Sequence, residues 1–155
     1  MLGSNSGDRS GQLRMAIDFI EKEIGNIIVK SKIYETAPWG KVDQPTFLNQ
    51  ALKIESPFSP DELLVKVQSI EQLQGRIRLE KWGERTIDID IIYYGDKIID
   101  SSFLVIPHPH LTERRFVLMP LTEISPDHIH PILKKSNFEL LKECTDTLAV
   151  KEFIN

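Results

Sequence analysis

Cysteine is nearly absent from this sequence: Cys144 is the one cysteine among 155 residues. A single cysteine cannot form a disulfide within the chain, which excludes the disulfide-stapled class of small secreted domains. The sequence also has no run of about 18 or more apolar residues, the length that a membrane-spanning helix needs. Its N-terminus lacks the apolar core of a signal peptide. We therefore expect a cytoplasmic protein with no membrane partner.

An excess of basic charge is also missing. The chain has 19 Lys and Arg residues against 23 Asp and Glu, giving a formal net charge of -4. Proteins that bind nucleic acid without sequence preference need a basic surface to displace counterions, so we expect no nucleic-acid partner. Glycine-rich phosphate loops are missing too, since neither a GxGxxG nor a Walker A pattern occurs. Any phosphate group must therefore be bound by a different kind of site.

The composition is that of an ordinary globular protein, with 41% hydrophobic and 27% charged residues. A chain of 155 residues can bury a core without disulfides and fits one domain, residues 1–155. No exposed apolar stripe in the sequence calls for a partner, so we expect a monomer.

Capping residues and helical spacing predict three helices. Apolar residues recur at helical spacing over residues 9–24, and Gly25 ends that helix. Ser59-Pro60-Asp61-Glu62 combines a capping box with a proline at the first helical position, and Gly75 stops the helix that follows. The capping pattern recurs at Ser136-Asn137-Phe138-Glu139, before a last helix.

Segments rich in β-branched residues predict the strands. Residues 1–8 are instead rich in turn formers, and we expect them to form a loop that follows a strand. The order β-α-β-β-α-β, with the first strand clipped, predicts an α+β fold: a ferredoxin-like antiparallel sheet with flanking helices, an α/β/α sandwich. The predicted strands are residues 27–36, 47–55, 86–94 and, after a turn at Gly95-Asp96, residues 97–99.

The sharpest chemical signal is the segment Arg85-Thr86-Ile87-Asp88-Ile89-Asp90-Ile91. Because side chains alternate along a strand, both aspartates face one way and the three isoleucines face the other. Magnesium takes oxygen ligands and is commonly shared between carboxylates and substrate phosphates. The alternative is a half-buried strand with its aspartates in water. However, aspartate is depleted in strands, and two on one face repel unless a cation lies between them.

Basic residues are interleaved with these acids. Arg76 and Arg78 follow the second helix, Lys81 lies in the next loop and Arg85 adjoins the aspartates. Arginine forks bind phosphate oxygens bidentately, so this set suits a polyphosphate with bound metal. A solvated basic loop is the simpler interpretation of these residues taken alone.

Two His-x-His pairs, at residues 108 and 110 and at residues 128 and 130, could suggest zinc. Prolines fix the first pair in a rigid loop and no cysteine lies nearby, so we interpret His108 as a phosphate contact instead. Phe47 and Phe116 are by default core residues when each is considered alone.

Six short motifs occur in a fixed order, and the ordered set with its spacings is highly specific. They are Leu2-Gly3-Ser4-Asn5, Phe47-Leu48-Asn49, Gly75-Arg76-Ile77-Arg78, Trp82-Gly83-Glu84-Arg85-Thr86-Ile87-Asp88-Ile89-Asp90, Pro107-His108-Pro109 and Arg114-Arg115-Phe116-Val117-Leu118. Over residues 2 to about 131, the chain resembles the 6-hydroxymethyl-7,8-dihydropterin pyrophosphokinases of folate biosynthesis.

The resemblance implies that Asp88 and Asp90 bind two Mg²⁺ ions that bridge the phosphates of ATP. It implies that Arg76 and Arg85 are catalytic-loop arginines on those phosphates. Three further positions match contacts to ATP, with His108 on phosphate and Glu71 on the nucleoside. These positions are Gln68, Glu71 and His108.

The resemblance also implies a pterin site. Phe47 and Phe116 match two aromatic residues that sandwich the ring, and Asn49 matches the amide that reads its polar edge. The implied reaction moves a diphosphoryl group from ATP to the hydroxymethyl group of the pterin, and AMP leaves. Trp39 and Trp82 lie in polar loops, and we interpret them either as plugs at the edge of the core or as lids that exclude water.

The chain departs from the family pattern at three places. Glu84 stands where proline is usual, and His110 stands where the family varies. Members also usually have more residues before the position of Gly3, so a shortened first strand is expected. Two rival functions remain open: a metal-dependent phosphohydrolase or nuclease that needs no pterin, and a nucleotide-sensing module without catalysis.

Overall fold

Side-chain caps begin three helices of the computed structural model, which describes residues 1–38, 44–75 and 85–154. The Asp8 carboxylate caps the first helix, and Ser59 with Glu62 and Ser136 with Glu139 form capping boxes at two others. These caps confirm the predicted helix starts. The helices are α1 (Arg9–Glu23), α2 (Pro60–Leu73), α3 (Arg115–Ile124) and α4 (Asn137–Glu143), with a 3-10 turn at Leu111–Glu113.

Strands pair antiparallel throughout the described part of the chain. They are β1 (Leu2–Ser4), β2 (Asn26–Lys30), β3 (Tyr34–Thr36), β4 (Phe47–Gln50), β5 (Leu52–Glu55), β6 (Asp88–Ile89), β7 (Ile99–Asp100), β8 (Val105–Ile106) and β9 (Val150–Glu152). The largest sheet has the order β6-β1-β4-β3-β9, while β2-β5 and β7-β8 form two-stranded sheets. This arrangement confirms the predicted α+β fold with a ferredoxin-like sheet.

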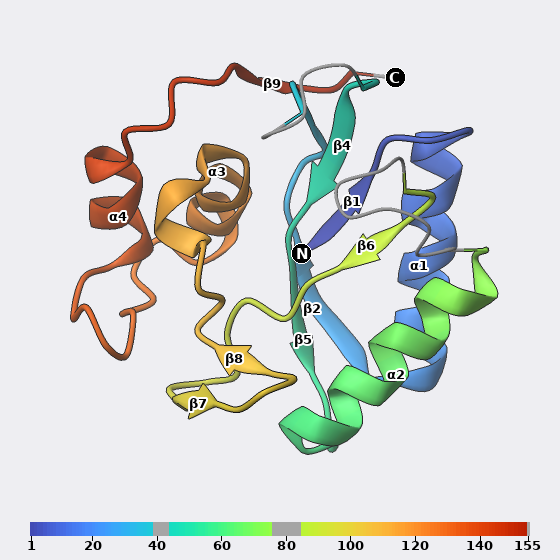
Figure 1. Cartoon of the computed structure of the whole chain (residues 1–155), viewed down its shortest axis with the longest axis horizontal. Helices are drawn as coiled ribbons and strands as arrows, with labels where there is room; N and C mark the ends of the chain where they lie inside the picture. The colour runs from blue at the N-terminus through green and yellow to red at the C-terminus, as the bar shows by residue number, and fades with distance from the viewer. Residues whose placement is uncertain (39–43, 76–84, 155) are drawn as a thin grey trace.

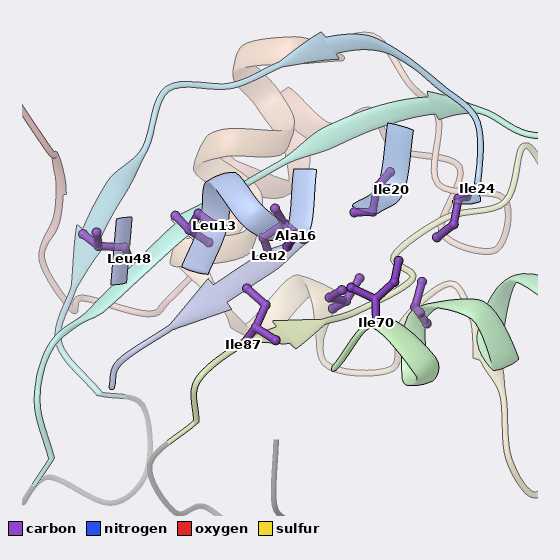
Figure 2. Close-up of a cluster of buried hydrophobic side chains, with 10 residues drawn as sticks. Leu2, Leu13, Ala16, Ile20, Ile24, Leu48, Ile70 and Ile87 are labelled. Atoms are coloured by element: carbon purple, nitrogen blue, oxygen red, sulfur yellow. The ribbon is translucent and has the colours of Figure 1, made fainter. Parts of the chain in front are cut away.

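Helices cover both faces of the sheet, as an α/β/α sandwich requires. In Figure 1, α1 and α2 lie on one side, and α3, backed by α4, lies on the other. The first core fills the α1/α2 side (Figure 2), and its fully buried members include Leu2, Leu13, Ile20, Leu48, Ile70 and Ile87. The second core lies on the α3/α4 side and includes Ala51, Ile92, Leu111, Leu118 and Leu140.

Two of the predicted strands are interrupted. Residues 31–33 separate β2 from β3, and Ala51 separates β4 from β5. The backbone N–H of Ser31 donates to the carbonyl of Ala51 at 3.0 Å. The N–H of Ala51, however, donates to the hydroxyl of Ser31 at 2.9 Å rather than to a backbone carbonyl. A side chain therefore replaces one rung of the ladder at a buried position.

The prediction that residues 1–8 form a loop is wrong at Leu2–Ser4, which is the interior strand β1. All three residues of β1 are buried, and the strand pairs with β4 on one side and β6 on the other. Three residues are too few to show strand periodicity. Their conformation is set instead by two partners that are distant in sequence.

The predicted strand over residues 86–94 is also longer than the observed one. β6 covers only Asp88–Ile89, and its backbone pairing extends as far as Asp90, whose N–H donates to the carbonyl of Met1. The predicted turn at Gly95-Asp96 is present, with a hydrogen bond from the N–H of Lys97 to the carbonyl of Tyr94. The strand that follows pairs with β8, however, so the hairpin is β7-β8.

Helix α3 was not predicted from the sequence. It contains Pro120, which lacks a backbone N–H and costs about 3 kcal/mol inside an ordinary helix. Burial of Val117, Leu118 and Leu121 against the second core offsets this cost, because each buried apolar side chain contributes roughly 1.5–3 kcal/mol.

We predict that Ser31→Ala lowers the free energy of unfolding by about 1–3 kcal/mol, because it leaves the buried N–H of Ala51 without its acceptor. Urea denaturation measures this change. Ser69→Ala, at an exposed position of α2, is the matched control and should change stability by less than about 0.5 kcal/mol. Equal stabilities of the two variants would contradict the role given to the Ser31 hydroxyl.

Candidate functional site

Asp88 and Asp90 lie on the sheet face that is turned away from the first core. Ile87 and Ile89 are 0% and 8% exposed and belong to the first core, so strand alternation places the two acids on the opposite face. Burial lowers the pKa of the half-buried Arg114 guanidinium, and the attraction of Asp90 and Asp88 opposes this shift. The two carboxylates therefore lie close enough to Arg114 to interact with its charge.

The amino terminus lies beside the same two acids. The amino group of Met1 donates a hydrogen bond to the backbone carbonyl of Asp90 at 2.8 Å. Burial lowers the pKa of this ammonium group, whereas the charges of Asp90 and Asp88 raise it. The inner edge of β6 is thus held by the start of β1.

Gly3 occupies the centre of a row that crosses three strands. It pairs with Asn49 of β4 on one side and with Asp88 of β6 on the other. A Cβ at Gly3 would lie 3.2 Å from Oδ1 of Asn49 and 4.0 Å from both Asp88 Cβ and Phe47 Cδ1. The missing side chain keeps open the space that Phe47, Asn49 and Asp88 surround.

The amide of Asn49 is held in a fixed orientation. Asn49 is 3% exposed, and its Nδ2 donates to the hydroxyl oxygen of Thr36 at 2.8 Å in a buried hydrogen bond. Phe116 comes from the first turn of α3, on the same side of the sheet, and its ring centroid lies 5.8 Å from the guanidinium carbon of Arg114. The sheet and α3 thus supply a buried amide and an aromatic ring to one side of the molecule.

Arg85 forms an ion pair with Asp88 through Nη1 and Oδ2, and both side chains are partly buried. Its backbone is fixed by Asn5, whose Oδ1 accepts from the N–H of Arg85 at 2.7 Å and whose N–H donates to the Arg85 carbonyl at 3.2 Å. Asn5 is itself 1% exposed. The last residue of the Leu2-Gly3-Ser4-Asn5 motif therefore positions the segment that leads into β6.

Glu71 supports the outer edge of β6. It is 4% exposed, and its Oε1 accepts from the backbone N–H of Ile89 at 2.8 Å, at the position between the two acids. Gln68 lies one helical turn earlier on α2 and is partly buried. Glu71 therefore helps to position the backbone of β6. Contacts of Gln68 and Glu71 with ATP stay predictions.

His108 lies near the acids in a segment that begins with the cis Ile106–Pro107 peptide bond. Its N–H donates to the carbonyl of Ile92 at 3.0 Å, and its Nδ1 accepts from the N–H of His110 at 3.2 Å. Burial, with a smaller contribution from Arg114, lowers the pKa of His108 to about 4. The ring is therefore neutral near pH 7 in this structure.

The second histidine pair lies beside Tyr93. His128 and His130 pack against Tyr93, with ring centroids 4.4 Å and 5.8 Å from that of the tyrosine. Among residues 1–38, 44–75 and 85–154, no three His, Cys, Asp or Glu side chains gather into a group that could hold a metal. The assignment of Asp88 and Asp90 as metal ligands stays a prediction.

Several predicted residues lie outside the described residues. They are Arg76, Arg78, Lys81 and Glu84 of the basic loop and the two tryptophans, Trp39 and Trp82. The described residues bring together Phe47, Asn49, Arg85, Asp88 and Asp90. Sequence patterns alone assign no role to two contributors, Arg114 and Asn5, although both lie within the quoted motifs.

Comparison with known proteins gives the family. The model of the 7,8-dihydro-6-hydroxymethylpterin-pyrophosphokinase (HPPK) family matches residues 1–126. The chain belongs to the HPPK family. The 2-amino-4-hydroxy-6-hydroxymethyldihydropteridine pyrophosphokinase of Aquifex aeolicus is 44% identical over 146 residues, which cover 93% of this chain and 89% of that protein. The protein of the same name from Haemophilus influenzae is 41% identical over 152 residues, covering 97% and 94%.

Solved structures agree with the HPPK fold. A crystal structure of HPPK-DHPS from Plasmodium falciparum superposes with a TM-score of 0.76 at 20% sequence identity. The match covers 92% of this chain but 44% of that longer one, so the chain spans less than half of the multidomain relative. At this identity the superposition shows the fold. No helix among the described residues is long and apolar enough to cross a membrane.

We predict that Gly3→Ala weakens binding of a pterin by about tenfold or more while the fold is kept, because the new Cβ meets the Asn49 amide at 3.2 Å. Quenching of pterin fluorescence measures the affinity. Gly95→Ala is the matched control: it strains a turn at φ 52° but has nothing within 4 Å of the new Cβ. It should lower stability without changing pterin affinity, and a loss of affinity in both variants would contradict the prediction.

We predict that the native state loses stability as the pH falls from about 6.5 towards 4, in part because of His108. Its pKa is about 4 in the folded chain and 6.5 in the reference state, so the unfolded chain takes up the proton first. His108→Gln should reduce the number of protons taken up on unfolding by up to about one. The slope of the unfolding free energy against pH measures this number. His110→Gln, at a half-exposed ring, is the control, and an unchanged slope for His108→Gln would refute the assignment.

Proposed function

We propose that this HPPK family member transfers the diphosphoryl group of ATP to the hydroxymethyl oxygen of 6-hydroxymethyl-7,8-dihydropterin and releases AMP, a step of folate biosynthesis. Family membership supports the reaction, and one structural observation connects it to this chain. Asp88, with its partner Arg85, and the pterin-side residues Phe47 and Asn49 meet around Gly3 on one face of the sheet. Groups suited to a charged phosphate and groups suited to a flat heterocycle are therefore adjacent.

Asp88 and Asp90 are the proposed ligands of two Mg²⁺ ions. The donor set consists of two partly buried carboxylates on one strand face, which suits a hard cation that completes its shell with water and phosphate oxygens. When bound, magnesium would neutralise phosphate charge and align the attacking and leaving oxygens. The backbone hydrogen bonds of Ile89 to Glu71 and of Asp90 to Met1 hold the two acids in place.

Arginines and a histidine around the acids are the proposed phosphate contacts. Arg85 and Arg76 are proposed as the catalytic arginines, which absorb charge that develops on the phosphates. His108 is proposed as a further phosphate contact, and because its pKa is lowered to about 4 it would donate a neutral hydrogen bond. Gln68 and Glu71 are proposed to contact ATP from α2.

The pterin ring is proposed to lie between Phe47 and Phe116, with its polar edge against Asn49. Stacking on two aromatic faces selects a flat ring, and a buried amide selects hydrogen-bonding groups on its edge. The side chain of Asn49 is already fixed by Thr36, so little ordering is left to binding. We further propose that the protein acts in the cytoplasm as a monomer, without a nucleic-acid or membrane partner.

This proposal is tested by asking whether AMP formation requires every component of the reaction. AMP should form only when the protein, ATP, magnesium and hydroxymethyl-dihydropterin are mixed together. Asp90→Asn should lower the rate of AMP formation by on the order of 100-fold or more, because it removes a metal-binding charge. Asp100→Asn, at an exposed position of β7, is the matched control and should keep the rate of the unaltered chain. Phosphate or AMP release without pterin would indicate a phosphohydrolase, and normal turnover by Asp90→Asn would rule out the metal assignment.

A further inference from the structure

The chain after α4 returns to the sheet. Residues 144–149 lead from the end of α4 past α3 to β9, which pairs antiparallel with β3 at the edge of the sheet (Figure 1). The N–H of Phe153 donates to the carbonyl of Ile33 at 2.8 Å, and the side chain of Phe153 packs against the first core. We call residues 144–154 the C-terminal strap.

Between α4 and β9, the C-terminal strap contacts the first turn of α3. Asp146 is partly buried, whereas its neighbours Thr145 and Thr147 are exposed. Its Oδ2 accepts from the backbone N–H of Arg115 at 3.0 Å, and its Oδ1 accepts from the N–H of Leu148 at 3.0 Å. A single carboxylate therefore joins the start of α3 to the strap.

Helix α3 begins with residues that are poorly suited to a helix N-terminus. Arg114 occupies the N-cap position, and a guanidinium has no acceptor for a backbone N–H. The first turn, all of which the structure describes, contains no acidic residue. Arg114 and Arg115 instead place two positive charges at the positive end of the helix dipole. Asp146 supplies both the hydrogen-bond acceptor and the negative charge that a helix N-terminus favours.

The capped turn carries residues of the candidate site. Phe116 is the ring proposed to stack on the pterin, and Arg114 interacts with the charges of the two proposed metal ligands. The other end of α3 is held directly to the sheet, since Glu123 accepts from the hydroxyl of Tyr34 in β3 at 2.9 Å. The strap therefore acts at the end of α3 where Phe116 lies.

The C-terminal strap also reaches the sheet side of the proposed pterin site. Val150 pairs with Thr36 of β3. The hydroxyl of Thr36 accepts from Nδ2 of Asn49 at 2.8 Å and so fixes the amide proposed to read the pterin edge. The short stretch of residues 146–150 thus connects the α3 side of the site to its sheet side.

We propose that Asp146 is a positioning residue for pterin binding: by capping α3 from the C-terminal strap, it holds Phe116 in place relative to Asn49. The inference rests on the proposed function and gives a part in substrate binding to a segment outside the six sequence motifs. When the first turn of α3 frays, fewer molecules present a formed site, and the apparent affinity falls in proportion. ATP is proposed to be held mainly from α2 and β6, so its affinity should change less.

The experiment compares the unaltered full chain with Asp146→Ala, Asp146→Asn and Thr147→Ala. Asp146→Ala removes the acceptor, Asp146→Asn keeps an amide oxygen that can accept from the N–H of Arg115, and Thr147→Ala changes an exposed side chain of the same strap. Fluorescence titration with hydroxymethyl-dihydropterin, in the presence of magnesium and a nonhydrolysable ATP analogue, measures pterin affinity. Calorimetric titration with the analogue alone measures nucleotide affinity.

We expect Asp146→Ala to weaken pterin binding by about tenfold and nucleotide binding by less than about twofold. Asp146→Asn should stay within about threefold of the unaltered chain, and Thr147→Ala should match it. Without any ligand, the backbone amide of Arg115 should exchange hydrogen at least about fivefold faster in Asp146→Ala than in Thr147→Ala.

Equal pterin affinities of Asp146→Ala and Thr147→Ala would overturn the proposal, even with a lower Tm for Asp146→Ala, because Asp146 would then only stabilise the fold. Equal losses in Asp146→Ala and Asp146→Asn would also overturn it, since the hydrogen bond to Arg115 would not be the cause. So would an equal loss of pterin and nucleotide affinity, which indicates general loosening. Failure of the proposed function is distinguishable, because the unaltered chain itself would then form no AMP from ATP and the pterin.

Discussion

The pairing of β1 between β4 and β6 is the constraint on which the candidate site depends. It places Gly3 between Asn49 and Asp88, so residues from three separate parts of the chain share one row. The first core fixes this register, because Leu2 and Leu48 are 1% exposed on the opposite face. A shift by one residue would exchange buried isoleucines for aspartates, at a large cost in desolvation. The face that holds the acids is therefore decided by packing on the other side of the sheet.

A two-residue strand such as β6 cannot hold two charged side chains in place by its own ladder. The structure supports it on both edges: Glu71 accepts the N–H of Ile89 from outside, and Met1 brackets the backbone of Asp90 from inside. Asn5 fixes the backbone of Arg85 just upstream. These contacts use backbone groups and leave the aspartate side chains directed at cationic neighbours. The carboxylates of Asp88 and Asp90 are therefore held in position before any charged ligand binds.

Local sequence patterns were enough to predict much of the fold and part of the site. The alternation of Asp88 and Asp90 with isoleucines, and the caps at Ser59 and Ser136, depend on neighbours within four residues, and they were predictable for that reason. Strand β1 was not predictable, since three residues carry no periodicity and its partners are distant. Helix α3 could not be predicted because Pro120 disfavours a helix locally. Burial against the second core offsets this cost, and such burial is a tertiary effect that local sequence does not show. The contacts of Arg114 and of Asn5 likewise arise only when separate segments meet.

The proposed recognition of a polar heterocycle would depend on how Asn49 is buried. At 3% exposure its amide has almost no access to water, and Nδ2 is already bonded to Thr36. A ligand that offered only apolar atoms to this amide would leave its free hydrogen-bonding groups without partners. Leaving such groups buried and unsatisfied would cost about 1–3 kcal/mol. In the proposed site, the missing side chain at Gly3 would let a flat ring approach close enough to make those bonds. Specificity would then come from the penalty on unsuitable ligands as much as from attraction to the right one.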